Sequence, residues 1–107
     1  MLNAERALDA LGDPTRRLVF KRLRAGTRSV REIAEGLDVS RPAVSQHLKV
    51  LKTAGLAVVR IEGTRRFYAI DMRGIEAVRS WLDGFWEKAL VAFQRAAERE
   101  ADKARKP

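Results

Sequence analysis

A chain of 107 residues is short enough to form one domain, and its 46% of hydrophobic residues can build a small core that would gain from a partner subunit. It contains no cysteine, no apolar run near the roughly 20 residues of a membrane span and no signal-peptide pattern, so we expect a cytoplasmic protein without disulfides. Its net charge of +8 favours an anionic partner such as nucleic acid.

Two short helices are predicted at the start of the chain. The first spans residues 3–11 and ends at Gly12. The second opens with Asp13, which can cap free N–H groups, and Pro14, which fits the first helical position, and it stops at Gly26. The apolar residues expected to face the core are Ala4, Ala7, Leu8 and Leu11 in the first helix and Leu18, Val19 and Leu23 in the second, with Phe20 offset to one side.

A helix-turn-helix motif is predicted over residues 29–54. Ser29 and Glu32 have the spacing of a capping box, and Gly36 allows a tight turn before the second helix. Ser40 caps that second helix. Its core-facing residues recur at helical spacing and are Val44, Leu48 and Leu51. A glycine C-cap at Gly55 ends the motif.

A β-hairpin and a long helix complete the predicted elements. Two β-branched and aromatic runs within residues 57–70 flank a Gly63-Thr64 turn, which is a hairpin signal, although both registers of the first strand leave apolar residues on each face. A C-terminal helix follows over residues 73–103. Its wide apolar stripe consists of Ile75, Val78, Leu82, Phe85, Trp86, Ala89 and Phe93, with Trp81 beside it.

The order of these elements is that of a winged helix-turn-helix. The fold is therefore expected to be mainly α with a small β-hairpin (α-α-α-α-β-β-α), as one domain over residues 1–107. In such domains the second motif helix lies in the DNA major groove. Residues 13–70 support this reading, because they hold 13 basic and 5 acidic side chains and so contain the whole charge excess.

The second motif helix carries side chains suited to DNA. Gln46 can form paired hydrogen bonds with adenine, Arg41 with guanine, and Ala43 can touch a thymine methyl group. Contacts to phosphate are expected from Ser45, Lys49 and Lys52. In the hairpin, Arg65 is the first choice for a DNA contact and Arg66 the second, because strand alternation can turn one of them away.

Other chemistries find little support in the sequence. His47 is the single histidine and cannot form a metal site alone, so we expect it to contact DNA or to pack half-buried. Ser45 and His47 point in different directions on a helix, so no catalytic pair is expected and the protein should not be an enzyme. The aromatic residues of the last helix could line a ligand pocket. We favour a homodimer interface formed by Leu8, Leu11, Trp81, Phe85, Trp86 and Phe93.

Three segments resemble the ArsR/SmtB family of bacterial winged-helix repressors. They are GDPTRR at 12–17, SRPAVSQHLKVLKTAGL at 40–56 and EGTRRFYAI at 62–70. The resemblance implies a dimer built from the first and last helices, which binds a two-fold symmetric operator and usually represses transcription. It carries the recognition role onto Ser40, Arg41, Ala43, Ser45, Gln46, His47 and Lys49, and the wing role onto Arg65 and Arg66.

The chain departs from the metal-sensing members of that family. The cysteine-rich site of their first motif helix is replaced here by SVREIAEGL, and the last helix contains no histidine. We therefore expect a dimeric repressor without a metal or other cofactor. Two alternatives stay open: a repressor that binds a small organic effector through its aromatic C-terminal helix, and a protein-binding, antitoxin-like module.

Overall fold

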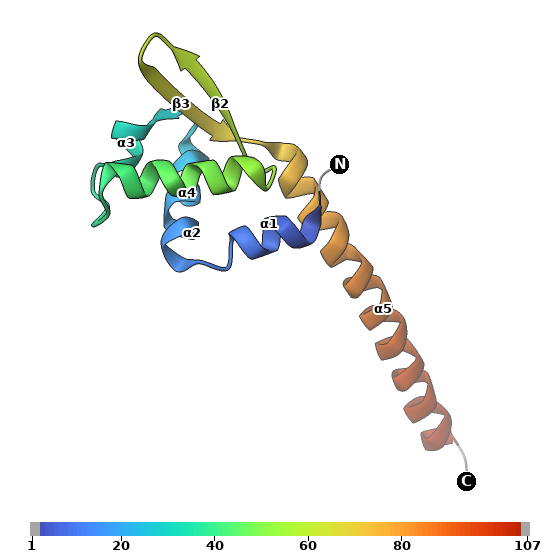
Figure 1. Ribbon diagram of the computed structural model, residues 1–107. Helices are drawn as coiled ribbons and strands as arrows, with labels where there is room; N and C mark the ends of the chain where they lie inside the picture. The colour runs from blue at the N-terminus through green and yellow to red at the C-terminus, as the bar shows by residue number, and fades with distance from the viewer. Residues whose placement is uncertain (1–2, 106–107) are drawn as a thin grey trace.

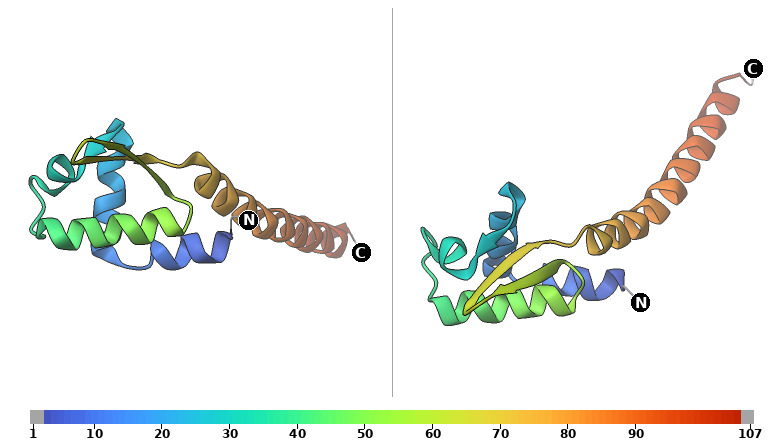
Figure 2. Two further views of the ribbon diagram at one scale, coloured as in Figure 1. Left: turned by 45° about the horizontal axis from the view of Figure 1, so that its top comes forward. Right: turned by 90° about the horizontal axis from the view of Figure 1, so that it is seen from above.

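A compact head and one long helical arm make up the molecule (Figure 1). The computed structural model describes residues 3–105. The head holds most elements, and the arm is α5, which leaves the head and projects away from it (Figure 2). In chain order the elements are α1 (Ala4–Ala10), α2 (Pro14–Lys21), the 3-10 helix η1 (Arg22–Ala25), β1 (Arg28–Ser29), α3 (Val30–Ala34), α4 (Arg41–Thr53), β2 (Ala57–Glu62), β3 (Arg65–Ile70) and α5 (Met72–Arg105).

The expected mainly helical fold with a small β-hairpin is confirmed. Two features were not predicted. The two-residue strand β1 adds to the hairpin, giving an antiparallel sheet of order β1-β3-β2. The second helix changes to 3-10 geometry for its last turn before Gly26.

Local caps fix the ends of α2, α3 and α4 as the sequence indicates. The Asp13 carboxylate accepts the Arg16 N–H at 3.0 Å, and Ser29 and Glu32 form the reciprocal capping box. At the end of α4, Gly55 has a φ of 80°, and the Leu56 N–H donates to the Leu51 carbonyl at 2.9 Å. This Schellman motif turns the chain sharply from α4 into the hairpin.

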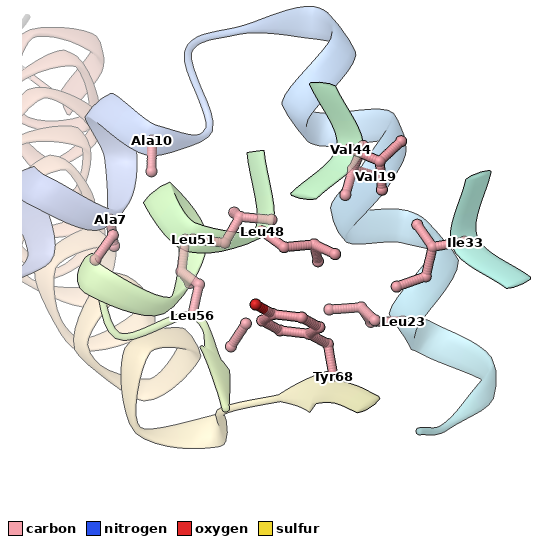
Figure 3. Close-up of a cluster of buried hydrophobic side chains, with 12 residues drawn as sticks. Ala7, Ala10, Val19, Leu23, Ile33, Val44, Leu48, Leu51, Leu56 and Tyr68 are labelled. Carbon is pink, nitrogen blue, oxygen red and sulfur yellow. The ribbon is translucent and has the colours of Figure 1, made fainter. Parts of the chain in front are cut away.

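The core lies where α1, α2, α3 and α4 meet the inner face of the sheet (Figure 3). Tyr68 enters from β3 and is 1% exposed, and its ring lies among Leu23, Leu48 and Leu56. The expectation that Leu18 is buried is wrong, because its side chain is 49% exposed. Val19 is the residue that faces α4, and Leu18 is turned about 100° away from it on the helix. Phe20 packs against the core instead.

Asp71 and Gly74 attach α5 to the head. The Asp71 N–H donates to the Leu56 carbonyl at 3.0 Å. Its buried carboxylate accepts the Arg73 N–H at 3.0 Å and pairs with the Arg73 guanidinium at 2.8 and 3.1 Å. Gly74 lies so close to the Gly55 carbonyl that a Cβ atom would stand 2.1 Å from its oxygen. The start of α5 is therefore held to the head by a backbone hydrogen bond and by a backbone contact that only glycine allows, while the Asp71–Arg73 ion pair orders its first turn.

Three carboxylates make stability depend on pH. Hydrogen bonds from Arg73 lower the pKa of Asp71 below its ordinary 3.8, and capping amides do the same for Asp13 and for Glu32, whose ordinary pKa is 4.5. Each lowered pKa stabilises the folded state when the carboxyl is ionised. This contribution is complete above about pH 5 and is lost as the pH falls through the lowered values.

We therefore expect the free energy of unfolding to decrease as the pH is lowered below about 5. Urea titrations at several pH values would measure it. Asp71→Asn should make that decrease shallower, whereas Asp83→Asn, at an exposed position of α5, should leave it as in the wild type. A wild-type unfolding free energy that is unchanged between pH 5 and pH 3 would contradict the assignment.

Candidate nucleic-acid interface

One side of α4 is anchored in the core and the other side faces solvent. Val44, Leu48 and Leu51 are fully buried. The exposed residues of the helix are Arg41, Pro42, Gln46, Lys49, Lys52 and Thr53. Gln46 and Lys49 lie one turn apart on this exposed side. A helix held this way has its polar face fixed relative to the rest of the head.

The remaining predicted recognition residues lie on the flanks of α4. Ala43 and Ser45 are half-buried. The Ser40 hydroxyl accepts the Ala43 N–H at 3.3 Å, so the structure uses it as the helix cap. This arrangement leaves Arg41, Gln46, Lys49 and Lys52 as the exposed side chains among the predicted DNA contacts of α4.

His47 is turned toward α2. Its side chain is half-buried, and its Nδ1 atom is buried without a hydrogen-bond partner. It lies near Asp13, the N-cap of α2. The hydrogen bond from the Arg16 amide lowers the pKa of Asp13, and His47 makes a small further contribution in the same direction. Of the two roles expected for His47, this position favours packing.

Strand pairing decides which wing arginine lies beside α4. Arg66 pairs with Ile61, and it lines a groove of about 440 Å³ together with Lys49 and Lys52. The adjacent Arg65 places its guanidinium 5.1 Å from the centre of the Phe67 ring, on the hairpin face that also carries Arg60. The position therefore favours Arg66 over Arg65, which reverses the order expected from the sequence. In the tip, Gly63 takes a φ of 61° in the two-residue turn.

Arg31 is a candidate that the sequence did not single out. It is exposed on the first turn of α3 and lines a second groove, of about 490 Å³, between α3, the start of α4 and the hairpin tip. Arginines in the first turn of a helix are common on protein surfaces, so the sequence around Arg31 does not mark it as a DNA contact. Only the folding of the hairpin over the motif brings it next to Arg41 and Arg66.

The groove between α1 and α4 lies on the other flank of α4. It is lined by Arg6 and Asp9 from α1, Arg16 from α2, and Gln46 and Lys49 from α4. Arg16 donates from Nη1 to the Ala10 carbonyl at 3.1 Å, and this hydrogen bond ties α2 to α1. Gln46 therefore stands at the edge of a basic groove, while Lys49 borders grooves on both sides of α4.

The residues expected at a dimer interface divide between the head and the arm. Leu8 and Leu11 are half-buried on α1, which lies against the start of α5. On the arm, every described residue from 79 onward is exposed. The rings of Trp81 and Phe85 nevertheless pack edge to face, with their centroids 4.6 Å apart. Trp86 is 68% and Phe93 71% exposed. The aromatic side chains thus lie on the surface of a single helix.

The described residues contain neither a cluster of metal ligands nor a membrane-spanning helix. Within residues 3–105, no three histidine, cysteine or acidic side chains lie close enough to hold a metal ion. Across the same described span, no helix combines the length and the apolar character needed to cross a membrane.

The sequence is similar to those of known transcriptional regulators. A sequence model described as a helix-turn-helix domain matches residues 11–60. The chain is 51% identical over 98 residues to the HTH-type transcriptional regulator Rv2034 of Mycobacterium tuberculosis, covering 92% of each chain. It is 30% identical over 79 residues to the transcriptional repressor SdpR of Bacillus subtilis, covering 74% of this chain and 88% of SdpR.

Solved structures with the same fold are also similar in sequence. A possible transcriptional regulator for arsenical resistance superposes with a TM-score of 0.69 at 38% identity, covering 80% of this chain and 93% of that one. The domain Mb0332 of Mycobacterium bovis, described as a homodimeric winged helix-turn-helix DNA-binding domain, gives a TM-score of 0.61 at 29% identity. That match covers 96% of this chain and 85% of Mb0332.

Proposed function

Because the chain belongs to the ArsR/SmtB family of winged helix-turn-helix transcriptional regulators, we propose that it is a homodimeric repressor of a palindromic operator and that it does not respond to metal ions. It is a DNA-binding protein in which α4 is the recognition helix and the β2–β3 hairpin is the wing.

The observation that carries the proposal is the orientation of α4. Its core side is fully buried, so Gln46 and Lys49 are held outward together. Arg66 lies across one groove from Lys49 and Lys52, and Arg6 and Arg16 share the groove on the other flank of α4 with Gln46. An amide that can form paired hydrogen bonds with adenine, surrounded by cations that can bind phosphate, provides both sequence reading and affinity.

The exposed arm supports a dimer. A large apolar face that is rimmed by polar residues normally marks an interaction site in a soluble protein. At 34 residues and about 1.5 Å per residue, α5 is roughly 50 Å long and offers a self-complementary surface to a second copy. Two recognition helices placed about 34 Å apart would enter successive major grooves, which requires a palindromic operator.

Metal-independent regulation is supported by the chemistry of the sequence. The chain has no cysteine, and its single histidine is on α4 and turned toward α2. Zinc and related ions need several convergent nitrogen or sulfur ligands. Operator binding that is unchanged by added zinc and by a chelator would agree with this part of the proposal, and release by zinc would contradict it.

Gln46→Ala is expected to relax the sequence preference at one base position of each half-site. The loss of a paired contact should cost about 1–3 kcal/mol of discrimination there, while non-specific binding stays nearly unchanged. Selection of bound fragments from a genomic library, followed by titration of single-base operator variants, would measure both quantities.

Gln94→Ala on α5 is the matched control, since it removes the same amide far from α4. It should leave the preference at every position as in the wild type. If Gln46→Ala also left binding and preference unchanged, α4 would not read the DNA through its outward face. If the wild-type protein selected no genomic fragment at moderate salt, the DNA-binding proposal itself would fail.

A further inference from the structure

The second groove, between α3, the start of α4 and the hairpin tip, collects positive charge from three elements. Its charged lining residues are Arg31 from α3, Arg41 from α4, and Arg65 and Arg66 from β3. The rest of the lining is Ser29, Val30 and Thr64, so no carboxylate lines the groove. All four guanidinium-bearing residues are exposed. Four cations around about 490 Å³ of open space favour an anionic occupant.

Two acidic groups beside the groove are already engaged. Glu62, the strand partner of Arg65, pairs with Arg60 at 3.0 Å. Glu32 accepts the Ser29 N–H at 3.1 Å in the capping box, and it lies 3.8 Å from Arg28. It also feels the charge of Arg65, whose guanidinium lies over the Phe67 ring. The positive charge of Arg65 is thus partly offset by the Glu32 carboxylate. Among the ion pairs within residues 3–105, none involves Arg31, Arg41 or Arg66, so these three remain available to a ligand.

This groove continues into the one between α4 and the inner face of the hairpin. Arg66 lines both grooves, and Lys49 and Lys52 line the groove between α4 and the hairpin. A row of cations therefore follows the whole boundary between the recognition helix and the wing. Figure 1 shows the hairpin rising from the C-terminal end of α4 toward the side of the head that holds α3.

The shape of B-DNA explains such a row. The major and the minor groove alternate along the duplex and are separated by a sugar-phosphate strand. If α4 lies in the major groove and the hairpin tip reaches the adjacent minor groove, one strand must pass between them. The boundary between α4 and the hairpin is the place where that strand would pass.

We propose that the groove formed by Arg31, Arg41, Arg65 and Arg66 binds backbone phosphates of that strand, which makes Arg31 a DNA contact and Arg41 a phosphate ligand instead of a guanine reader. This inference rests on the proposed DNA-binding function and adds a specific site to it. A free phosphate anion offers the same chemistry, so the experiment includes an arm for that source. Guanidinium groups suit either ligand, because they form paired hydrogen bonds with phosphate oxygens.

The test measures operator and non-specific DNA affinity over a series of salt concentrations. Arg31→Gln should weaken binding to all sequences, by roughly tenfold at low salt, and should reduce the slope of log K against log salt by about 0.9 per subunit. Arg41→Gln should do the same without changing the base preference of the half-site. Arg99→Gln on the far part of α5 removes the same charge from an exposed position and should change neither quantity.

Three results would overturn the proposal. The first is an Arg31→Gln protein with the affinity and salt slope of Arg99→Gln. The second is an Arg41→Gln protein that loses preference at one base pair, because a phosphate ligand carries no sequence information. The third is saturable binding of inorganic phosphate to the DNA-free protein at micromolar concentration that Arg31→Gln abolishes while its DNA affinity stays that of the wild type, since a free anion would then be the ligand. Each of these leaves wild-type operator binding intact, so they are distinct from a failure of the proposed function.

Discussion

Gly74→Ala is expected to lower the melting temperature by roughly 10–20 °C, the largest effect we expect from adding one methyl group to this chain. The new Cβ atom would stand 2.1 Å from the Gly55 carbonyl oxygen and 2.7 Å from its carbon. Both are backbone atoms of the turn that ends α4, so neither can rotate away. The clash can be removed only if α5 or that turn shifts, which should lower the free energy of unfolding by about 2–3 kcal/mol. Thermal unfolding followed by circular dichroism would measure it.

Gly84→Ala is the matched control for this prediction. It makes the same substitution in the same helix, at a position where the new Cβ atom meets nothing within 4 Å. Replacing an exposed helix glycine with alanine should stabilise the protein by about 0.5–1 kcal/mol. Equal melting temperatures for the two variants would show that α5 does not pack on Gly55 as described.

Trp86→Glu is expected to convert the dimer to monomers and to weaken operator binding by at least about 100-fold. Trp86 is 68% exposed on α5, so the head has no need of it for folding. In the proposed dimer it is covered by the second copy, where a carboxylate would be buried without a partner. Sedimentation would report the oligomeric state, and titration of a labelled operator would report the affinity.

Gln94→Glu provides the control for charge. It also introduces a carboxylate on the exposed part of α5, at a position flanking the stripe that contains Trp86 and Phe93. It should leave the protein dimeric. A Trp86→Glu protein that remains dimeric with wild-type affinity would rule out this face as the interface, whereas unfolding of the head would mean that Trp86 packs within one subunit.

The local features of the fold could be predicted because each is fixed by neighbours in the sequence. Asp13, Ser29 and Ser40 cap helices through amides at most three residues away, and all three are confirmed as caps. The glycine at 55 ends α4 by the same local logic. The buried residues of α4 follow from the helical period alone. The family could be recognised for the same reason, since its motifs lie in these short segments.

The burial of Leu18 and the order of the two wing arginines were predicted wrongly, because the sequence pattern allowed two orientations and tertiary packing selected one of them. Leu18 and Phe20 flank Val19 on the same helix, and either could have been buried. The contact of α2 with α4 left Leu18 in solvent. In the wing, both registers placed apolar residues on each face, and pairing of Tyr68 with Val59 over the core turned Arg66 toward α4 and Phe67 to the other face.

The bounds of α4 and its buried side could be read from the sequence, because caps and the helical period act within a few residues of each other. The surroundings of α4 could not, because they depend on the packing of distant segments. Arg31 and Arg66 are 35 positions apart in the chain and share a groove only because the hairpin folds back over the motif. Gly74 meets Gly55 for a similar reason, since the contact depends on how α5 leaves the sheet. Contacts between distant segments depend on the packing of the whole core, and no local pattern records them.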